Sequence, residues 1–262
     1  MDVATALGTY LDIADSAAPG LVEGLYVVGS YALGDWVEDH SDIDVVVVTA
    51  EPATDDDYGD LLTVHAVLAE QQPRPHIDGP YLAWGDLVVE PATGLHRPWT
   101  LEGELHHDGD CFEINPLTWY TLARYGVTVR GTDPWRIGIP TDTEARIRFV
   151  VDNLNSYWRD VANDVAARAA AEPDRQWQPS ALEWCGLGAL RLHYTAFTAD
   201  VTSKRGAGEY GLATSPMEFH PVVQRALAIR TLPDQTPPTS DEMSAAARLI
   251  AWVIDDVRAA AG

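Results

Sequence analysis

Cysteines, basic residues and long apolar runs are all scarce in this chain of 262 residues. The two cysteines, Cys111 and Cys185, lie far apart and form no Cys-x-x-Cys pair, so the sequence predicts neither a disulfide framework nor a structural zinc site. No run of about 18 apolar residues occurs, and no basic start is followed by an apolar segment. We therefore expect no membrane segment and a cytoplasmic protein.

The shortage of basic residues is the strongest signal in the composition. Only 17 lysine and arginine residues stand against 40 acidic residues, which gives a formal net charge of −23 at pH 7. Such an acidic surface repels a phosphate backbone, so it argues against a nucleic-acid partner and favours a cationic small molecule. The alternative is that most of the excess carboxylates only keep the protein soluble.

The most informative stretch covers residues 25–48, where two apolar runs flank a polar segment. Both runs are rich in β-branched residues, which predicts buried strands. The first run ends at Gly29 and Ser30, where a turn would offer backbone amides and a hydroxyl to phosphate oxygens. Asp42 and Asp44 alternate with an apolar residue, so both carboxylates should point to one face and provide half of a Mg²⁺ site.

Each motif alone has a plainer interpretation, because Gly-Ser is common in turns and Asp-x-Asp also occurs at solvated strand ends. The full order of strand, Gly-Ser, spacer, Asp-x-Asp and strand is much more specific. This segment resembles the signature of the nucleotidyltransferase superfamily that includes DNA polymerase β. Its Gly-Ser pair and the His-Ser-Asp-Ile-Asp at residues 40–44 resemble the streptomycin/spectinomycin adenylyltransferases, the aminoglycoside adenylyltransferase family.

The resemblance implies a fold and an assignment of roles. The fold would be α+β, with a mixed sheet and helices followed by an all-α helical bundle. ATP would be the co-substrate, with its phosphates on Gly29, Ser30 and Ser41, and Mg²⁺ would be bound by Asp42 and Asp44.

A third carboxylate is expected from a later strand, over residues 76–84. The family has a glutamate preceded by Arg-Pro and one apolar residue, and this chain has Arg-Pro-His-Ile-Asp at residues 74–78, with one inserted residue and Asp78 in place of glutamate. Asp78 would deprotonate the acceptor hydroxyl, where distance decides whether a general base works. The alternatives are that Asp78 belongs to a turn with Gly79-Pro80, or that Asp86 takes the role.

Around this core the sequence predicts helices over residues 2–17 and 57–71, with His65 packed in the core. Residues 86–114 should form a partly exposed hairpin close to the active site, followed by a helix that begins at Asn115-Pro116. Long helical patterns replace short apolar runs beyond Pro140, so we expect domains at 1–139 and 140–262. The second should contain helices over 142–171, 180–200, 221–230 and 240–257, with a polar stretch at 203–206.

The helical domain also carries resemblance. Residues 187–201, followed by Ser-Lys, are similar to an adenylyltransferase stretch whose Arg and Lys reach the triphosphate, so Arg191 and Lys204 inherit that role. The alternatives are an ion pair of Arg191 with Glu183 and a solvated loop for Lys204. For the acceptor, the family uses a tryptophan and acidic residues in a segment comparable with 174–184, which implies acceptor contacts for Trp177 and Glu183 alongside Asp78.

These features predict a monomeric, Mg²⁺-dependent nucleotidyltransferase that moves AMP from ATP to a hydroxyl of a cationic small molecule. The leading acceptor is an aminoglycoside or aminocyclitol antibiotic, which would make the enzyme a resistance factor. Two alternatives stay open. One is the same chemistry on another acceptor, either a protein side chain or a different small molecule. The other is a catalytically silent nucleotide-binding module, which the intact Asp42 and Asp44 pair disfavours.

Overall fold

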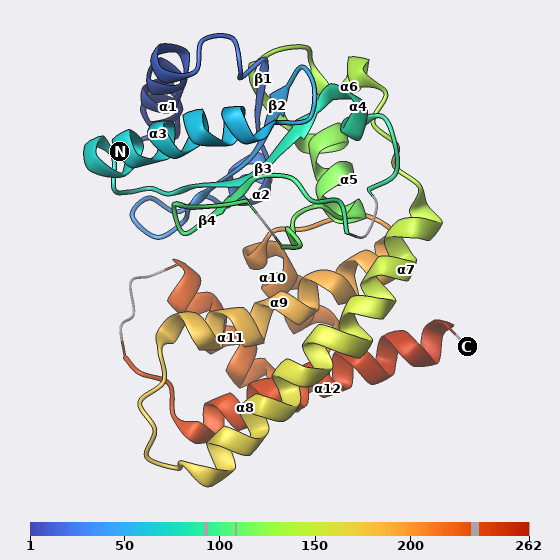
Figure 1. The fold of residues 1–262 in the computed structure, drawn as a ribbon. Coiled ribbons are helices and arrows are strands. Elements are labelled where there is room, and N and C mark those ends of the chain that lie inside the picture. Colours follow the sequence, from blue (N-terminus) through green and yellow to red (C-terminus); the bar gives the residue numbers. More distant parts are fainter. Residues whose placement is uncertain (92–93, 108, 232–235, 262) are drawn as a thin grey trace. The chain divides into compact units, whose positions relative to one another are not determined.

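The computed structural model describes residues 1–91, 94–107, 109–231 and 236–261, and the chain divides into two compact units (Figure 1). The units are Met1–Asp142 and Thr143–Gly262, and each is described by itself. None of the helices in the described part of the chain combines the length and apolar character that a bilayer span requires.

The first unit is built on a six-stranded mixed sheet with the order β5-β4-β3-β2-β1-β6. Only the β2–β3 pair is parallel within this sheet, and the other neighbours run antiparallel. Both predicted strands of the central motif are present, and the mixed sheet with helices confirms the predicted fold class. The strands are β1 (Gly24–Val27), β2 (Ile43–Thr49), β3 (Ile77–Ala83), β4 (Trp99–Leu101), β5 (Glu104–His106) and β6 (Val127–Arg130).

Helices cover both faces of this sheet (Figure 1). On one face, α1 (Val3–Ala17) and α3 (Asp55–Gln71) pack around buried side chains that include Tyr10 and Leu61. On the other face, α5 (Pro116–Tyr125) contributes Trp119 and Leu122. The predicted helices over 2–17 and 57–71 are confirmed. Three short helices complete the unit, α2 (Gly29–Ala32), α4 (Trp84–Leu87) and α6 (Pro134–Ile137).

Helix α3 begins at a capping box and contains a buried histidine. Thr54 and Asp57 form a reciprocal capping box at its N-terminus. Further along, His65 is buried, and its Nε2 lies 2.7 Å from the hydroxyl oxygen of Tyr81. Burial lowers the pKa of His65 to about 4. The prediction that His65 is a packed core histidine is confirmed.

The second unit is all helical, as predicted. Its first helix is continuous over residues 143–171 but contains one π-helical turn, so it is recorded as α7, η1 and α8. The remaining elements pack mainly around α9 and α12. The elements are α7 (Thr143–Asn153), η1 (Leu154–Trp158), α8 (Arg159–Ala171), α9 (Pro179–Thr198), α10 (Lys204–Thr214), η2 (Met217–Phe219), α11 (His220–Thr231) and α12 (Ser240–Ala261).

One expectation about this unit was wrong, because the polar stretch at 203–206 is the start of a helix. The hydroxyl of Ser203 accepts a hydrogen bond from the Gly206 backbone amide at 3.1 Å and caps α10. Glycines lower the intrinsic helix propensity of this segment. They also allow close packing, since a Cβ at Gly208 would lie 2.5 Å from Leu227 Cδ2 and one at Gly211 would lie 2.6 Å from Leu190 Cδ1. Tertiary packing therefore overrides the local signal.

Candidate active site

The carboxylates of the central motif meet a third one across the parallel strand pair. Asp42 directly precedes β2, and Asp44 is the second residue of that strand. Asp78, in β3, is the register partner of Asp44. Because the two strands run in the same direction, their N-terminal ends lie side by side. They form one edge of the sheet, in the sense of its strand ends and not of an outermost strand, and all three side chains belong to that edge.

Gly29 and Ser30 lie against Asp44. Gly29 has a φ of 55°, which favours glycine, and a Cβ there would collide with the Asp44 carboxylate. The Ser30 backbone amide donates a hydrogen bond of 3.3 Å to Asp44 Oδ2. The predicted turn is therefore present as the start of α2, and its glycine is what allows the Asp44 carboxylate to approach the backbone.

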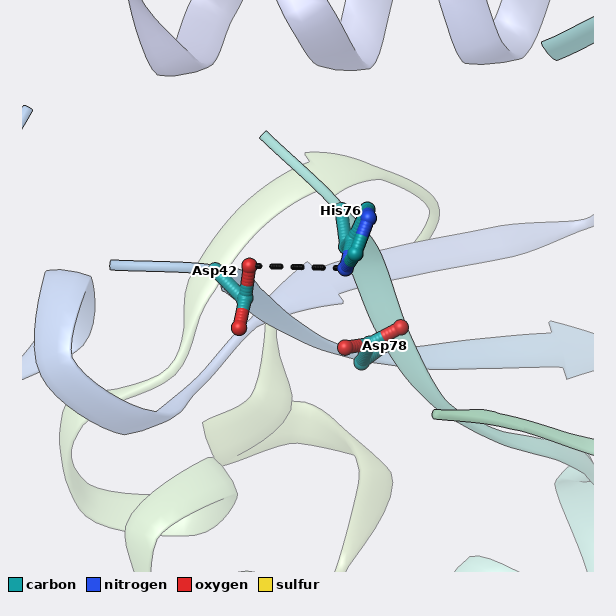
Figure 2. A group of neighbouring side chains, drawn as sticks. All are labelled: Asp42, His76 and Asp78. Carbon is teal, nitrogen blue, oxygen red and sulfur yellow. Dashed lines mark ion pairs between the residues drawn. The ribbon is translucent and has the colours of Figure 1, made fainter. Parts of the chain in front are cut away.

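Asp42 and Asp78 form a cluster with His76, the residue before β3. One ligand-type atom from each of the three side chains lies within 4.8 Å of the others. Figure 2 shows the three side chains pointing toward one another, with 3.7 Å between His76 Nδ1 and Asp42 Oδ1. Asp42 Oδ1 also accepts a hydrogen bond of 2.9 Å from Nη1 of Arg74, an exposed side chain.

Asp78 is the most constrained of the three carboxylates. It is 5% exposed, and its two oxygens accept hydrogen bonds from the backbone amides of Glu102 at 2.9 Å and Gly103 at 3.0 Å. The pKa of Asp78 is raised, chiefly by burial and also by the charge of Asp42, while the two amides lower it. Glu102 and Gly103, whose amides donate these hydrogen bonds, lie in the turn between β4 and β5. These two strands form the predicted hairpin.

The alternatives for the third carboxylate find no support. Strand β3 continues through Gly79 and Pro80 rather than turning there. Asp86 is held in a different set of contacts, because its Oδ2 accepts a hydrogen bond of 2.9 Å from the Ala83 backbone amide and one of 2.8 Å from Arg97 Nε.

Ser41 shapes the loop that leads into Asp42. Its hydroxyl oxygen accepts a hydrogen bond of 3.1 Å from the Val37 backbone amide, and its own amide donates to the Val37 carbonyl at 2.8 Å. The side chain is nearly buried. The hydroxyl therefore has a structural partner in this loop, and its predicted contact with phosphate stays a prediction.

Sequence reasoning missed Glu113, a further carboxyl group of this edge. The pKa of Glu113 is raised well above its usual range, first by burial and then by the charges of Asp44 and Asp78. A Cβ on Gly79 of β3 would lie 3.3 Å from Glu113 Oε2. The segment before α5 has no strand or helix periodicity, and the available signal was an acidic residue between the apolar Phe112 and Ile114.

His76 lies in the Arg-Pro-His-Ile-Asp segment, and no role in the site was assigned to it from the sequence. The signal for it was present, since His76 and Asp78 are two residues apart at the start of an extended segment. That spacing places both side chains on one face of a strand.

Of the four site residues predicted in the helical unit, Lys204 and Glu183 contact each other, while Arg191 and Trp177 have contacts elsewhere in the unit. Lys204 Nζ donates a hydrogen bond of 2.9 Å to Glu183 Oε1, and Arg230 Nη1 lies 3.4 Å from the same oxygen. Glu183 is 2% exposed. The structure therefore brings Lys204 and Glu183 together and adds Arg230, which the sequence did not single out. Arg191 has a separate contact, because its Nε donates a hydrogen bond of 3.3 Å to the carbonyl of Thr202.

Trp177 is buried in the helical unit rather than exposed as a flat binding surface. Its indole nitrogen donates a hydrogen bond of 3.2 Å to the Ser240 hydroxyl at the start of α12. The Arg175 guanidinium lies 4.9 Å from the centre of its ring. These contacts give Trp177 a packing role, and its predicted contact with an acceptor is not tested by them.

The edge of the sheet fits a divalent cation. Carboxylate oxygens are the preferred ligands of Mg²⁺, and Asp42 and Asp78 direct theirs toward one point. His76 Nδ1 beside them is buried and has no hydrogen-bond partner in the described part of the chain. An unsatisfied buried nitrogen next to converging carboxylates is expected where a cation binds.

A family model matches part of the first unit, and a solved structure has a similar fold over nearly the whole chain. The family model described as the nucleotidyltransferase domain matches residues 9–78, which contain Gly29, Ser30, Asp42, Asp44 and Asp78. No relative among curated proteins matches the sequence. Among solved structures, the spectinomycin adenyltransferase AAD(9) from Enterococcus faecialis, with ATP and spectinomycin, is similar at a TM-score of 0.68 and 14% identity, covering 97% of this chain and 100% of that one.

Proposed function

We propose that the chain is a nucleotidyltransferase that transfers AMP from ATP to a hydroxyl of a cationic small molecule, because a nucleotidyltransferase domain model matches residues 9–78 and the fold is similar to that of a spectinomycin adenyltransferase. The observation that carries this proposal is the meeting of Asp42 and Asp78 at one edge of the β2–β3 pair, with Asp44 as the register partner of Asp78. The similar AAD(9) structure contains ATP and spectinomycin, which supports ATP and an aminocyclitol as the substrates here.

The proposed nucleotide site begins at Gly29 and Ser30, where the start of α2 offers backbone amides to the phosphates. Asp42, Asp44 and Asp78 would hold the cation, which in its bound state neutralises charge on the phosphates and favours departure of pyrophosphate. Arg191 and Lys204 are proposed as cations for the same phosphates, by their match to the family.

Asp78 suits the role of general base. The acceptor hydroxyl would give its proton to the Asp78 carboxylate while its oxygen bonds to the α-phosphorus and the bond from that phosphorus to pyrophosphate breaks. The Glu102 and Gly103 amides hold the carboxylate in one orientation, which fixes the direction of proton transfer.

A cationic acceptor is supported by charge. The net charge of −23 attracts polycations and repels anions. The buried Glu183 already forms ion pairs with Lys204 and Arg230, so an acceptor ammonium group would have to compete with two resident cations there. We therefore place the main acceptor contact at Asp78 and keep Glu183 and Trp177 as secondary candidates.

Mass spectrometry of candidate acceptors tests the proposal directly. The protein is incubated with ATP, Mg²⁺ and, in separate reactions, spectinomycin, streptomycin or an uncharged sugar, with the Asp44→Asn variant as control. We expect the mass of one AMP to be added to a cationic acceptor by the wild type alone. Transfer to the protein fraction of a lysate alone would favour a protein acceptor, and ATP binding without any transfer would favour the silent module.

A further inference from the structure

We propose that His76 is a ligand of the cation at the Asp42 and Asp78 cluster. The site would then combine a nitrogen donor with carboxylates and bind a transition-metal ion in preference to Mg²⁺. This inference rests on the proposed function, since it concerns the same cation, and it changes the expected identity of that cation.

The three donors are already close enough to share one ion. Their ligand atoms lie within 4.8 Å of one another, and two ligands on opposite sides of a small divalent cation are about 4.2 Å apart. Small side-chain rotations therefore bring all three into contact with one ion. The backbone at His76 is fixed, because its carbonyl accepts a hydrogen bond of 2.8 Å from the Ile43 amide.

The unpaired Nδ1 atom of His76 indicates that this nitrogen binds a ligand. Nδ1 is buried, and it has no hydrogen-bond partner among the residues that the structure describes. Its distance of 3.7 Å to Asp42 Oδ1 is too long for a hydrogen bond. Buried polar atoms are nearly always paired, and a neutral imidazole nitrogen next to carboxylates is a common metal ligand.

One turn holds both His76 and Asp78 in place. Gly103 has a φ of 79° and donates its amide to Asp78 Oδ1. A Cβ at Gly103 would lie 3.2 Å from His76 Cδ2, so the glycine leaves just enough room for the imidazole ring. The turn between β4 and β5 thus orients the Asp78 carboxylate and lies beside the His76 imidazole, and a carboxylate held in this way is what a preorganised metal site needs.

The cation that now contacts Asp42 is easily displaced. Arg74 donates to Asp42 Oδ1, but its side chain is 68% exposed. Exposed ion pairs of this kind are weak. A divalent ion that engages three donors would therefore replace Arg74 at Asp42.

An imidazole ligand changes which ion is preferred. Mg²⁺ favours oxygen ligands and retains its waters, whereas imidazole suits the later first-row transition metals. A site with only carboxylates has a weaker bias of this kind. His76 would therefore raise the affinity for Co²⁺ relative to Mg²⁺, and its removal would reduce that ratio.

Pulsed electron paramagnetic resonance on Mn²⁺ detects the ligand directly. The full-length protein is labelled with ¹⁵N only in histidine and loaded with Mn²⁺ and a non-hydrolysable ATP analogue, so any ¹⁵N coupling comes from a histidine ligand. We expect the coupling in the wild type and in His96→Ala, an exposed histidine, and its loss in His76→Ala and His76→Asn. The Asn variant keeps a polar side chain of similar reach and guards against a folding defect in the Ala variant.

Calorimetric titration with Co²⁺ and with Mg²⁺ measures the preference. In His76→Ala we expect the Co²⁺ affinity to fall about tenfold or more, with a smaller change for Mg²⁺. Absence of histidine coupling in the wild type overturns the proposal, whether the ion is bound by carboxylates alone or not bound. A coupling that survives in His76→Asn overturns it as well. Neither readout needs turnover, so failure of AMP transfer with the coupling present would count against the proposed function and not against His76.

Discussion

Asp44 and Asp78 are directly opposite each other on the parallel strands β2 and β3. Each carboxylate is anchored by backbone amides of a different segment, Asp44 by Ser30 and Asp78 by Glu102 and Gly103. Like charges at this spacing repel each other, so the arrangement is maintained by these anchors and is suited to a cation that lowers the repulsion.

Replacing Asp44 by asparagine should abolish most AMP transfer without unfolding the protein. The change keeps the side-chain volume and removes one negative charge from the proposed cation site, so we expect the rate to fall about a hundredfold or more. The rate of AMP transfer and the urea midpoint are measured together. Asp60→Asn, an exposed position in α3, serves as the control and should retain full activity. Normal turnover by Asp44→Asn would remove Asp44 from the metal site.

Gly29→Ala and Gly34→Ala form a matched pair. Both glycines have a positive φ, 55° and 69°, so each substitution carries a similar backbone penalty of about 1–2 kcal/mol. Only at Gly29 would the new Cβ collide with the Asp44 carboxylate, since nothing lies within 4 Å at Gly34. We expect Gly29→Ala to lose more unfolding free energy than Gly34→Ala, because the collision adds to the shared backbone penalty, and we expect a large loss of activity in Gly29→Ala alone. Equal activities would show that the position of Asp44 does not matter.

The free energy of unfolding should decrease in acid because of His65. Its pKa is lowered by burial from 6.5 to about 4, so the unfolded chain binds a proton there before the folded chain does. His65 therefore lowers the free energy of unfolding as the pH falls from about 6.5 toward 4. The total decrease is about 3 kcal/mol, and above about pH 6.5 there is none.

The measurement is urea unfolding at several pH values for the wild type, His65→Gln and the exposed control His96→Gln. The difference in unfolding free energy between wild type and His65→Gln should shrink as the pH falls from 6.5 to 4. The control should follow the wild type. A constant difference for His65→Gln would contradict a neutral buried histidine hydrogen-bonded to Tyr81.

Glu183→Gln should destabilise the helical unit. Glu183 and Arg230 are 2% and 4% exposed, so removing the carboxylate charge weakens a buried ion pair with Arg230 and the pair with Lys204, at a cost of about 3 kcal/mol. Urea unfolding measures this cost, with Glu218→Gln at an exposed position as the control. Unchanged stability combined with weaker acceptor binding would instead establish Glu183 as an acceptor contact.

The sequence by itself determined the elements that rest on local patterns. Short runs of β-branched residues predicted β1 and β2, the Gly-Ser pair predicted the turn at α2, and apolar periodicity predicted α1, α3 and the long helices of the second unit. The alternation of Asp42 and Asp44 placed two carboxylates at one edge of the sheet. These predictions succeed because they depend on neighbours within a few residues, where the chain geometry is fixed.

The partners of those residues were decided only by the tertiary structure. Pairing of β3 with β2 places His76 and Asp78 beside Asp42, and the turn after β4 provides the amides that hold Asp78. Glu113 and Arg230 lie in segments without a distinctive pattern, and α10 forms although its glycines disfavour a helix. Such contacts join residues far apart in the chain, so their energies depend on packing and burial that no local pattern encodes.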